Sequence, residues 1–133
     1  MSNGNIEELQ IMNKQEAIDG LGGLELFESM LEGFEDLSLR KNLTGLKIAL
    51  DEIDYYSIRM QAHSLKGSSS YLRAERVTKL AEKIQSDVEK RLAQEIFKDY
   101  ATLIKQCILL KRMIRYEIFK KAGNHTIHLL TLL

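Results

Sequence analysis

At 133 residues, of which 44% are hydrophobic and none is proline or tryptophan, the chain has the size of one domain that can bury a core of its own. Its 19 basic side chains balance 19 acidic ones, and a formal net charge of zero gives no electrostatic support to nucleic-acid binding. A single cysteine, Cys107, excludes an internal disulfide, and no apolar run reaches the ~18 residues of a membrane-spanning helix, so we expect a cytoplasmic protein, or in a eukaryote one that is also nuclear.

The two ends of the chain differ from its middle. Residues 1–12 are mostly polar, resemble neither a signal peptide nor a basic transit peptide, and are interpreted as an N-terminal extension. Residues 13–123 have helical periodicity and form the predicted domain. Residues 124–133 form an apolar C-terminal tail, which we expect to pack on the domain or to contact another chain. The tail's two histidines, His125 and His128, would need further ligands to converge on them, and we expect no metal site.

Three helices are predicted before the centre of the chain. Asn13 with Glu16 three residues later resembles a capping box and predicts a short helix, which the following glycines end. An apolar stripe predicts the next helix over 24–34, whose acidic outer face we assign to solvent. Ser38 is the predicted cap of a third helix that continues to Leu50.

The most informative stretch lies on a predicted helix over 54–72. One face of this helix is apolar or small, with +4, +3, +4, +3 spacing, and consists of Ile58, Ala62, Leu65, Ser69 and Leu72. At ~100° per residue, His63 lies about 140° from the centre of that face and points to water. Lys66 and Gly67 are its neighbours one turn further along the helix.

These neighbours suit a histidine that acts as a nucleophile. A neutral imidazole has a lone pair, and its pKa of about 6.5 keeps it largely neutral at cellular pH. If a phosphoryl group were added to His63, the ammonium group of Lys66 could neutralise the new charge. Gly67 has no Cβ and leaves space beside the ring for a bulky group or for a partner's loop.

Two further helices complete the predicted fold. After a turn at 73–75, an inner face includes Val77, Ile84 and Val88, with Gln85 at its border. A long helix over 96–118 has one buried stripe, which contains Cys107 as a core residue, and ends near Gly123. No strand pattern competes with this interpretation. The fold expected is therefore all-α, an antiparallel up-and-down four-helix bundle with extra short N-terminal helices.

The string His-Ser-Leu-Lys-Gly-Ser-Ser at 63–69 resembles the motif of the histidine-containing phosphotransfer (HPt) family, His-x-Leu-Lys-Gly-Ser-Ser. Residues 17–23 resemble the first segment of the family's bundle, and the likeness covers about 13–121. The chain departs from the family at Arg73, where the usual residue is glycine. If this position needs positive φ, arginine costs ~1 kcal/mol; alternatively, the helix ends differently.

The resemblance implies that His63 accepts a phosphoryl group from a receiver-domain aspartate and passes it to another receiver. It implies that Lys66 balances charge, that Gly67 clears room for the receiver, and that Gln85 supports His63. Five residues near the histidine are predicted to contact the partner: Tyr56, Arg59, Met60, Ser64 and Ser70.

The implied partners are receiver domains of hybrid sensor histidine kinases and of response regulators, with no nucleic acid and no membrane. The chain has no glycine-rich phosphate loop, and we expect a phosphocarrier that has no kinase activity and no cofactor of its own. Mg²⁺ is expected on the partner only. We expect a monomer, although a dimer through the tail stays open.

The sequence leaves two other functions open. The dimerisation and phosphoacceptor part of a histidine kinase usually has an acidic residue directly after the histidine and then Arg-Thr-Pro, whereas here Ser64 follows and the chain has no proline. A non-catalytic helical adaptor that only binds receiver domains would not require His63 and Lys66 together.

Overall fold

The computed structural model describes residues 5–131, and the side chains of residues 5–123. Within this part of the chain all regular structure is helical and there is no strand, which confirms the all-α prediction. The elements in order are η1 (Ile6–Glu8), α1 (Lys14–Leu21), α2 (Leu24–Phe34), the π-helical η2 (Glu35–Arg40), α3 (Lys41–Glu52), α4 (Tyr55–Tyr71), α5 (Glu75–Glu89) and α6 (Ala93–Thr131).

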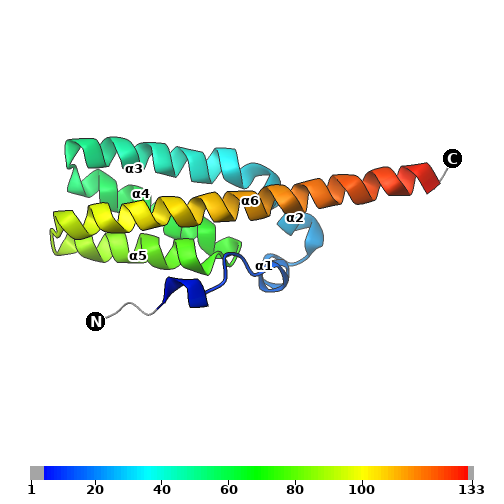
Figure 1. Cartoon of the computed structure of the whole chain (residues 1–133), viewed down its shortest axis with the longest axis horizontal. Helices are drawn as coiled ribbons and strands as arrows, with labels where there is room; N and C mark the ends of the chain where they lie inside the picture. The colour runs from blue at the N-terminus through cyan, green and yellow to red at the C-terminus, as the bar shows by residue number, and fades with distance from the viewer. Residues whose placement is uncertain (1–4, 132–133) are drawn as a thin grey trace.

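Figure 1 shows α3, α4, α5 and α6 lying lengthwise beside one another, with α1 and α2 near one end of the group. Helix α6 runs past that end and leads to the C-terminus. Although α6 has 39 residues, neither it nor any other described helix is long and apolar enough to cross a membrane.

The N-terminal end of α1 is built as its sequence predicts. The side-chain oxygen of Asn13 accepts a hydrogen bond of 3.0 Å from the backbone N–H of Glu16, which satisfies one of the free donors of the first turn. The helix ends at Gly22, whose φ of 92° lies in the left-handed region that favours glycine. The predicted short helix before the glycines is thereby confirmed.

The predicted cap at Ser38 is wrong, because the chain does not leave helical geometry between α2 and α3. Phe34 and Leu39 are both buried although they are five residues apart, a spacing that does not fit a regular α-helix. The wider π-helical turn of η2 accommodates the extra residue and brings both side chains to the core. A hydroxyl can cap only where the backbone enters a helix, and no helix begins here.

The core stripes of α4, α5 and α6 follow their predicted periodicity. All five predicted inner residues of α4 are buried, as are Val77, Ile84 and Val88 of α5. On α6 the thiol of Cys107 is buried, and burial raises its pKa to about 12. A thiol with so high a pKa is almost never a thiolate at neutral pH, which agrees with its prediction as a core residue.

Helix α6 does not end near Gly123, and that prediction is wrong: the helix continues to Thr131. A glycine inside a helix costs only ~1 kcal/mol relative to alanine, so it does not by itself end one. Before this point, Arg115 makes two hydrogen bonds of 2.8 and 2.7 Å to the carboxylate of Glu35 and ties α6 to η2. The expected packing of 124–133, including its two histidines, lies outside the described side chains.

The N-terminal segment is attached to α5 by Arg76 and Glu75, and the backbone N–H of Gln10 donates a hydrogen bond of 3.2 Å to the carboxylate of Glu75. The guanidinium group of Arg76 donates hydrogen bonds to the carbonyl oxygens of Leu9 at 2.8 Å and of Glu7 at 2.9 Å. Met12, at the end of the same segment, is buried in the core. The part of the predicted extension that the structure describes therefore packs against the helices.

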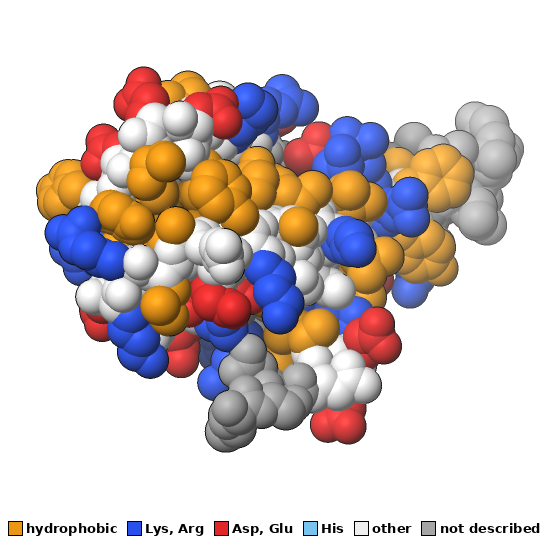
Figure 2. Space-filling model, turned by 60° about the vertical axis from the view of Figure 1, so that its left-hand side comes forward, with side chains coloured by type: hydrophobic (Ala, Val, Ile, Leu, Met, Phe, Trp, Pro, Cys, Tyr) orange, Lys and Arg blue, Asp and Glu red, His pale blue; other side chains and the backbone are white. Residues whose placement is uncertain are grey.

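Hydrophobic side chains form a band across the face of the molecule on which α3 and α6 lie (Figure 2). Exposed apolar residues of these two helices include Ile48, Phe97 and Ile108. No histidine is visible in this view.

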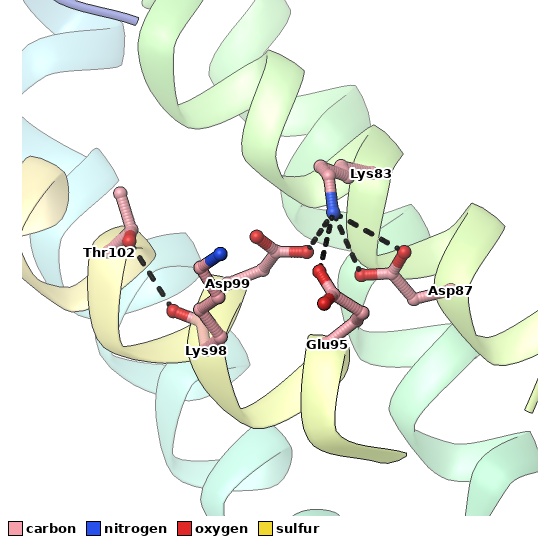
Figure 3. Close-up of polar contacts among 6 residues, drawn as sticks. All are labelled: Lys83, Asp87, Glu95, Lys98, Asp99 and Thr102. Atoms are coloured by element: carbon pink, nitrogen blue, oxygen red, sulfur yellow. Dashed lines mark hydrogen bonds and ion pairs between the residues drawn. The ribbon is translucent and has the colours of Figure 1, made fainter. Parts of the chain in front are cut away.

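The contact between α5 and α6 contains an ionic cluster around Lys83 (Figure 3). Its ammonium nitrogen lies 2.5 Å from a carboxylate oxygen of Asp99, 3.4 Å from both oxygens of Asp87 and 3.6 Å from Glu95. Burial raises the pKa of Asp87, and the hydrogen bond and charge of Asp99 raise it further, to about 6. Lys83 opposes this shift only in part.

We predict that Asp87 makes the fold less stable as pH rises toward neutrality. The folded chain binds a proton at Asp87 more tightly than the unfolded chain, whose aspartate has an ordinary pKa of 3.8. Its contribution to stability is therefore complete below that value and is lost as pH rises to about 6. We expect urea unfolding to show that, between about pH 5 and 7.5, the free energy of unfolding of the wild type falls by on the order of 1 kcal/mol relative to that of Asp87→Asn. The exposed Asp19→Asn is the control, and parallel pH profiles for wild type and Asp87→Asn would contradict the prediction.

Candidate functional site

His63 is exposed on the outer side of α4, opposite the buried stripe, as its helical position predicts. Its ring is engaged from α5, because Nδ1 lies 3.2 Å from the side-chain amide nitrogen of Gln85. The structure therefore brings Gln85 to His63, and the other ring nitrogen, Nε2, makes no hydrogen bond within the part of the chain that the structure describes. An exposed ring fixed at one nitrogen presents the second nitrogen in a defined direction.

The amide of Gln85 can stabilise either tautomer of the neutral ring. When the amide nitrogen donates to Nδ1, the ring proton resides on Nε2. When the amide is turned by 180°, its oxygen accepts the Nδ1–H bond and Nε2 has the free lone pair. The second arrangement makes Nε2 of His63 a nucleophile without any change in backbone position.

Lys66 lies one turn after His63 on α4, and its ammonium nitrogen is 3.7 Å from a carboxylate oxygen of Glu82 on α5. Their side chains are 41% and 51% exposed, so the pair is accessible to water. Sequence reasoning missed Glu82. The signal that could have found it is the expected support of His63 by Gln85: one turn forward on α4 from His63 to Lys66 corresponds to one turn back on α5 from Gln85 to Glu82.

Gly67 has open space beside it. A Cβ built at this position would meet no atom within 4 Å, apart from its own helical backbone and chain neighbours. No contact among the described residues explains a glycine in the middle of α4, where it costs ~1 kcal/mol relative to alanine. The space is available to a group bound at His63 or to a partner that approaches it.

The predicted partner-binding residues share the outer side of α4 with the histidine. Tyr56, Arg59, Met60 and Ser64 are all exposed, and Tyr56 retains 68% of its accessible surface. Ser70 is half-buried, and its hydroxyl donates a hydrogen bond of 2.7 Å to the carbonyl oxygen of Gly67 within the same helix. Helical spacing therefore aligns these side chains with His63 on one accessible strip, whatever they bind.

One buried hydrogen bond holds α4 to α5 near the site. The hydroxyls of Ser69 and Thr78 lie 2.7 Å apart, and Ser69 is fully buried. Each hydroxyl also lies within hydrogen-bond distance of a backbone carbonyl oxygen of its own helix region, Ser69 of Lys66 at 3.3 Å and Thr78 of Ala74 at 3.0 Å, so either hydroxyl can donate to the other. This pair fixes how far α5 can slide along α4, and therefore where Gln85 and Glu82 lie.

Arg73, the departure from the family pattern, adopts the left-handed backbone that glycine favours, with φ of 53°. Its guanidinium donates a hydrogen bond of 2.7 Å to the carbonyl oxygen of Ser70, near the end of α4. Its own carbonyl oxygen accepts one of 3.1 Å from the backbone N–H of Asn13. These bonds offset the cost of about 1 kcal/mol for a non-glycine residue in this conformation.

The described residues contain no group of three or more His, Cys, Asp or Glu side chains that could hold a metal ion.

A family model described as the Hpt domain matches residues 25–114, which include the whole of α4 and α5. No curated protein and no solved structure matches the chain.

We predict that the hydroxyls of Ser69 and Thr78 stabilise the fold as a pair. Ser69→Ala leaves the hydroxyl of Thr78 without its hydrogen-bond partner on α4 and should cost about 1 kcal/mol of unfolding free energy. In a double-mutant cycle with Thr78→Val, urea unfolding should give a coupling of about 1 kcal/mol. Ser70→Ala removes a less buried hydroxyl that bonds its own helix and is the control. Additive effects of Ser69→Ala and Thr78→Val would contradict the prediction.

Proposed function

The chain belongs to the Hpt domain family, and we propose that it is a phosphorelay intermediate that carries a phosphoryl group on His63 from one receiver domain to another. The family implies histidine phosphotransfer in two-component signalling and, with it, interaction with receiver domains. The observation that carries the proposal for this chain is the exposed ring of His63, held at Nδ1 by Gln85 next to Lys66.

The proposed step is a displacement at phosphorus. The lone pair on Nε2 of His63 attacks the phosphorus of the receiver's aspartyl phosphate, an N–P bond forms, and the P–O bond to the aspartate breaks. The aspartate leaves as a carboxylate and takes the electron pair of that bond. The ring keeps its proton on Nδ1 and becomes cationic, and the amide of Gln85, turned so that its oxygen faces Nδ1, accepts a hydrogen bond from that N–H. Attack by a second receiver's carboxylate reverses these changes and frees the ring.

Lys66 and Gly67 serve this step without forming covalent bonds. Phosphoryl transfer depends on positioning and on stabilising charge, and a flexible ammonium group can follow the phosphoryl oxygens. The open space at Gly67 gives the phosphoryl group and the receiver's loops access to the ring. In this proposal the receiver supplies the aspartate and the Mg²⁺, and the chain acts as a phosphocarrier that has no kinase activity and no cofactor of its own.

The proposed docking surface surrounds His63 on α4. Tyr56 and Met60 supply exposed apolar area on one side of the ring, and Arg59 supplies a positive charge. Ser64 and Ser70 add polar contacts on the same strip. Apolar area that becomes covered excludes water, and a cation beside it suits a partner whose site is rich in carboxylates. The partners proposed are receivers of hybrid sensor histidine kinases and of response regulators.

The proposal assumes that α3, α4, α5 and α6 form an antiparallel up-and-down four-helix bundle, with the short N-terminal helices at one end. It is supported for α4 and α5 by the order of their contacts: His63 meets Gln85, Lys66 meets Glu82, and Ser69 meets Thr78 further along. Positions that advance on one helix and recede on the other are typical of antiparallel neighbours. In such a bundle, residues that point outward from α4 stay accessible to a partner along the whole length of the helix.

We predict that His63 is the residue that is phosphorylated. Incubation with a phosphorylated receiver domain should transfer label that is stable in alkali and labile in acid, and His63→Gln should abolish the transfer. A variant with both His125→Gln and His128→Gln removes the other histidines of the sequence and should be labelled like the wild type. Equal labelling of His63→Gln would reject the assignment. A wild type that binds the receiver but takes up no label would favour a docking protein instead.

We predict that Gln85 speeds the transfer by holding the ring. Gln85→Ala removes the hydrogen bond to Nδ1 and should lower the rate of phosphotransfer from the receiver by about tenfold, as loss of one hydrogen bond to a group that becomes charged implies. Rapid-quench labelling measures this rate. The exposed Gln94→Ala on α6 is the matched control. A rate within twofold of the wild type for Gln85→Ala would contradict a supporting role.

A further inference from the structure

Glu82 is an acidic residue in direct contact with the proposed phosphotransfer site. It lies on α5 one turn before Gln85, and its carboxylate oxygen is 3.7 Å from the ammonium nitrogen of Lys66. Gln85 in turn contacts His63. Two neighbouring positions of α5 therefore contact the two residues of α4 that the proposed transfer uses.

The pair of Lys66 and Glu82 is built so that it can exchange partners. Both side chains are close to half exposed, and ion pairs of this kind contribute little to stability. A phosphoryl group on His63 would bring nearly two negative charges within one helical turn of Lys66. Because the lysine stem has four flexible carbons, its ammonium group can reach either anion. The phosphoryl group and Glu82 thus compete for one cation.

We propose that Glu82 is a positioning residue that holds Lys66 in the unphosphorylated protein and competes with the phosphoryl group for it, so that the phosphohistidine is less stable and onward transfer is favoured. This inference rests on the proposed function. Its consequence is specific: the carboxylate sets the share of the phosphoryl group that resides on this chain when it is at equilibrium with a receiver.

Glu82 would not be left without a cation when Lys66 turns to the phosphoryl group. It lines a shallow hollow of about 140 Å³ together with Arg73, Lys79, Glu75 and Thr78. Lys79 lies three residues before Glu82 on α5, within reach along the helix surface. Arg73 approaches the same hollow from the end of α4. These cations lower the cost of releasing Lys66 but do not remove the competition for it.

The test is Glu82→Gln, which keeps the shape of the side chain and removes its charge. The protein is equilibrated with a labelled receiver domain, and the ratio of label on the two proteins is measured. The ratio should shift toward this chain by about threefold to fivefold, the effect of an exposed charge pair. Glu25→Gln on α2 makes the same change in net charge at an exposed position and should leave the ratio unchanged.

A second pair of variants separates competition for Lys66 from plain repulsion between Glu82 and the phosphoryl group. In a Lys66→Ala background, Glu82→Gln should shift the ratio by less than half as much as in the wild type. A full shift in that background, or no shift in the wild-type background, would overturn the inference. Both results can be obtained only if the wild type is labelled on His63. A wild type that takes up no label would instead reject the proposed function itself.

Discussion

The packing of α4 against α5 is the contact on which the candidate site depends. Small residues, among them Ala62, Ser69 and Ala81, are fully buried between the helices of this part of the core, so that the two backbones can approach closely. The hydroxyl pair of Ser69 and Thr78 then fixes their relative position along the axis. At the outer edge of this contact, residues of α4 that point to solvent contact residues of α5, and together they form the candidate site. Neither helix contains the site alone.

Two lysines on these helices differ in how freely their ammonium groups can move, and their surroundings explain the difference. Lys83 faces α6 and contacts three carboxylates; although desolvation lowers its pKa, the bonds and charges of Asp99 and Asp87 raise it overall. Moving that ammonium group would leave buried carboxylates without a partner, which is costly. Lys66 faces solvent and has one half-exposed partner in Glu82. It can change partners at small cost, which is the property that a charge-neutralising residue needs.

Periodicity within one helix could be read from the sequence, and relations between helices largely could not. The buried stripe of α4, the exposure of His63 and the cap at Asn13 depend on neighbours three or four residues apart, and the structure bears them out. The cap at Ser38 was wrong because the five-residue spacing of Phe34 and Leu39 was not recognised as a wider turn. Glu82 was missed for a different reason: its partner is set by the register of α5 on α4, which the pattern of a single helix does not contain.

The turn that joins the two helices sets that register together with the hydroxyl pair of Ser69 and Thr78, and Arg73 lies at its centre. Each residue of an α-helix turns it by about 100°, so one residue more or fewer in the turn would rotate Gln85 and Glu82 away from His63 and Lys66. The positive φ of Arg73 closes the turn in the fewest residues, and its hydrogen bonds to Ser70 and from Asn13 hold that geometry. An arginine in place of glycine therefore does more than tolerate an unfavourable conformation. Its side chain is hydrogen-bonded to the end of α4, and its carbonyl oxygen is hydrogen-bonded to the start of α1. Because the length of this turn is fixed, Gln85 is aligned with His63 and Glu82 with Lys66.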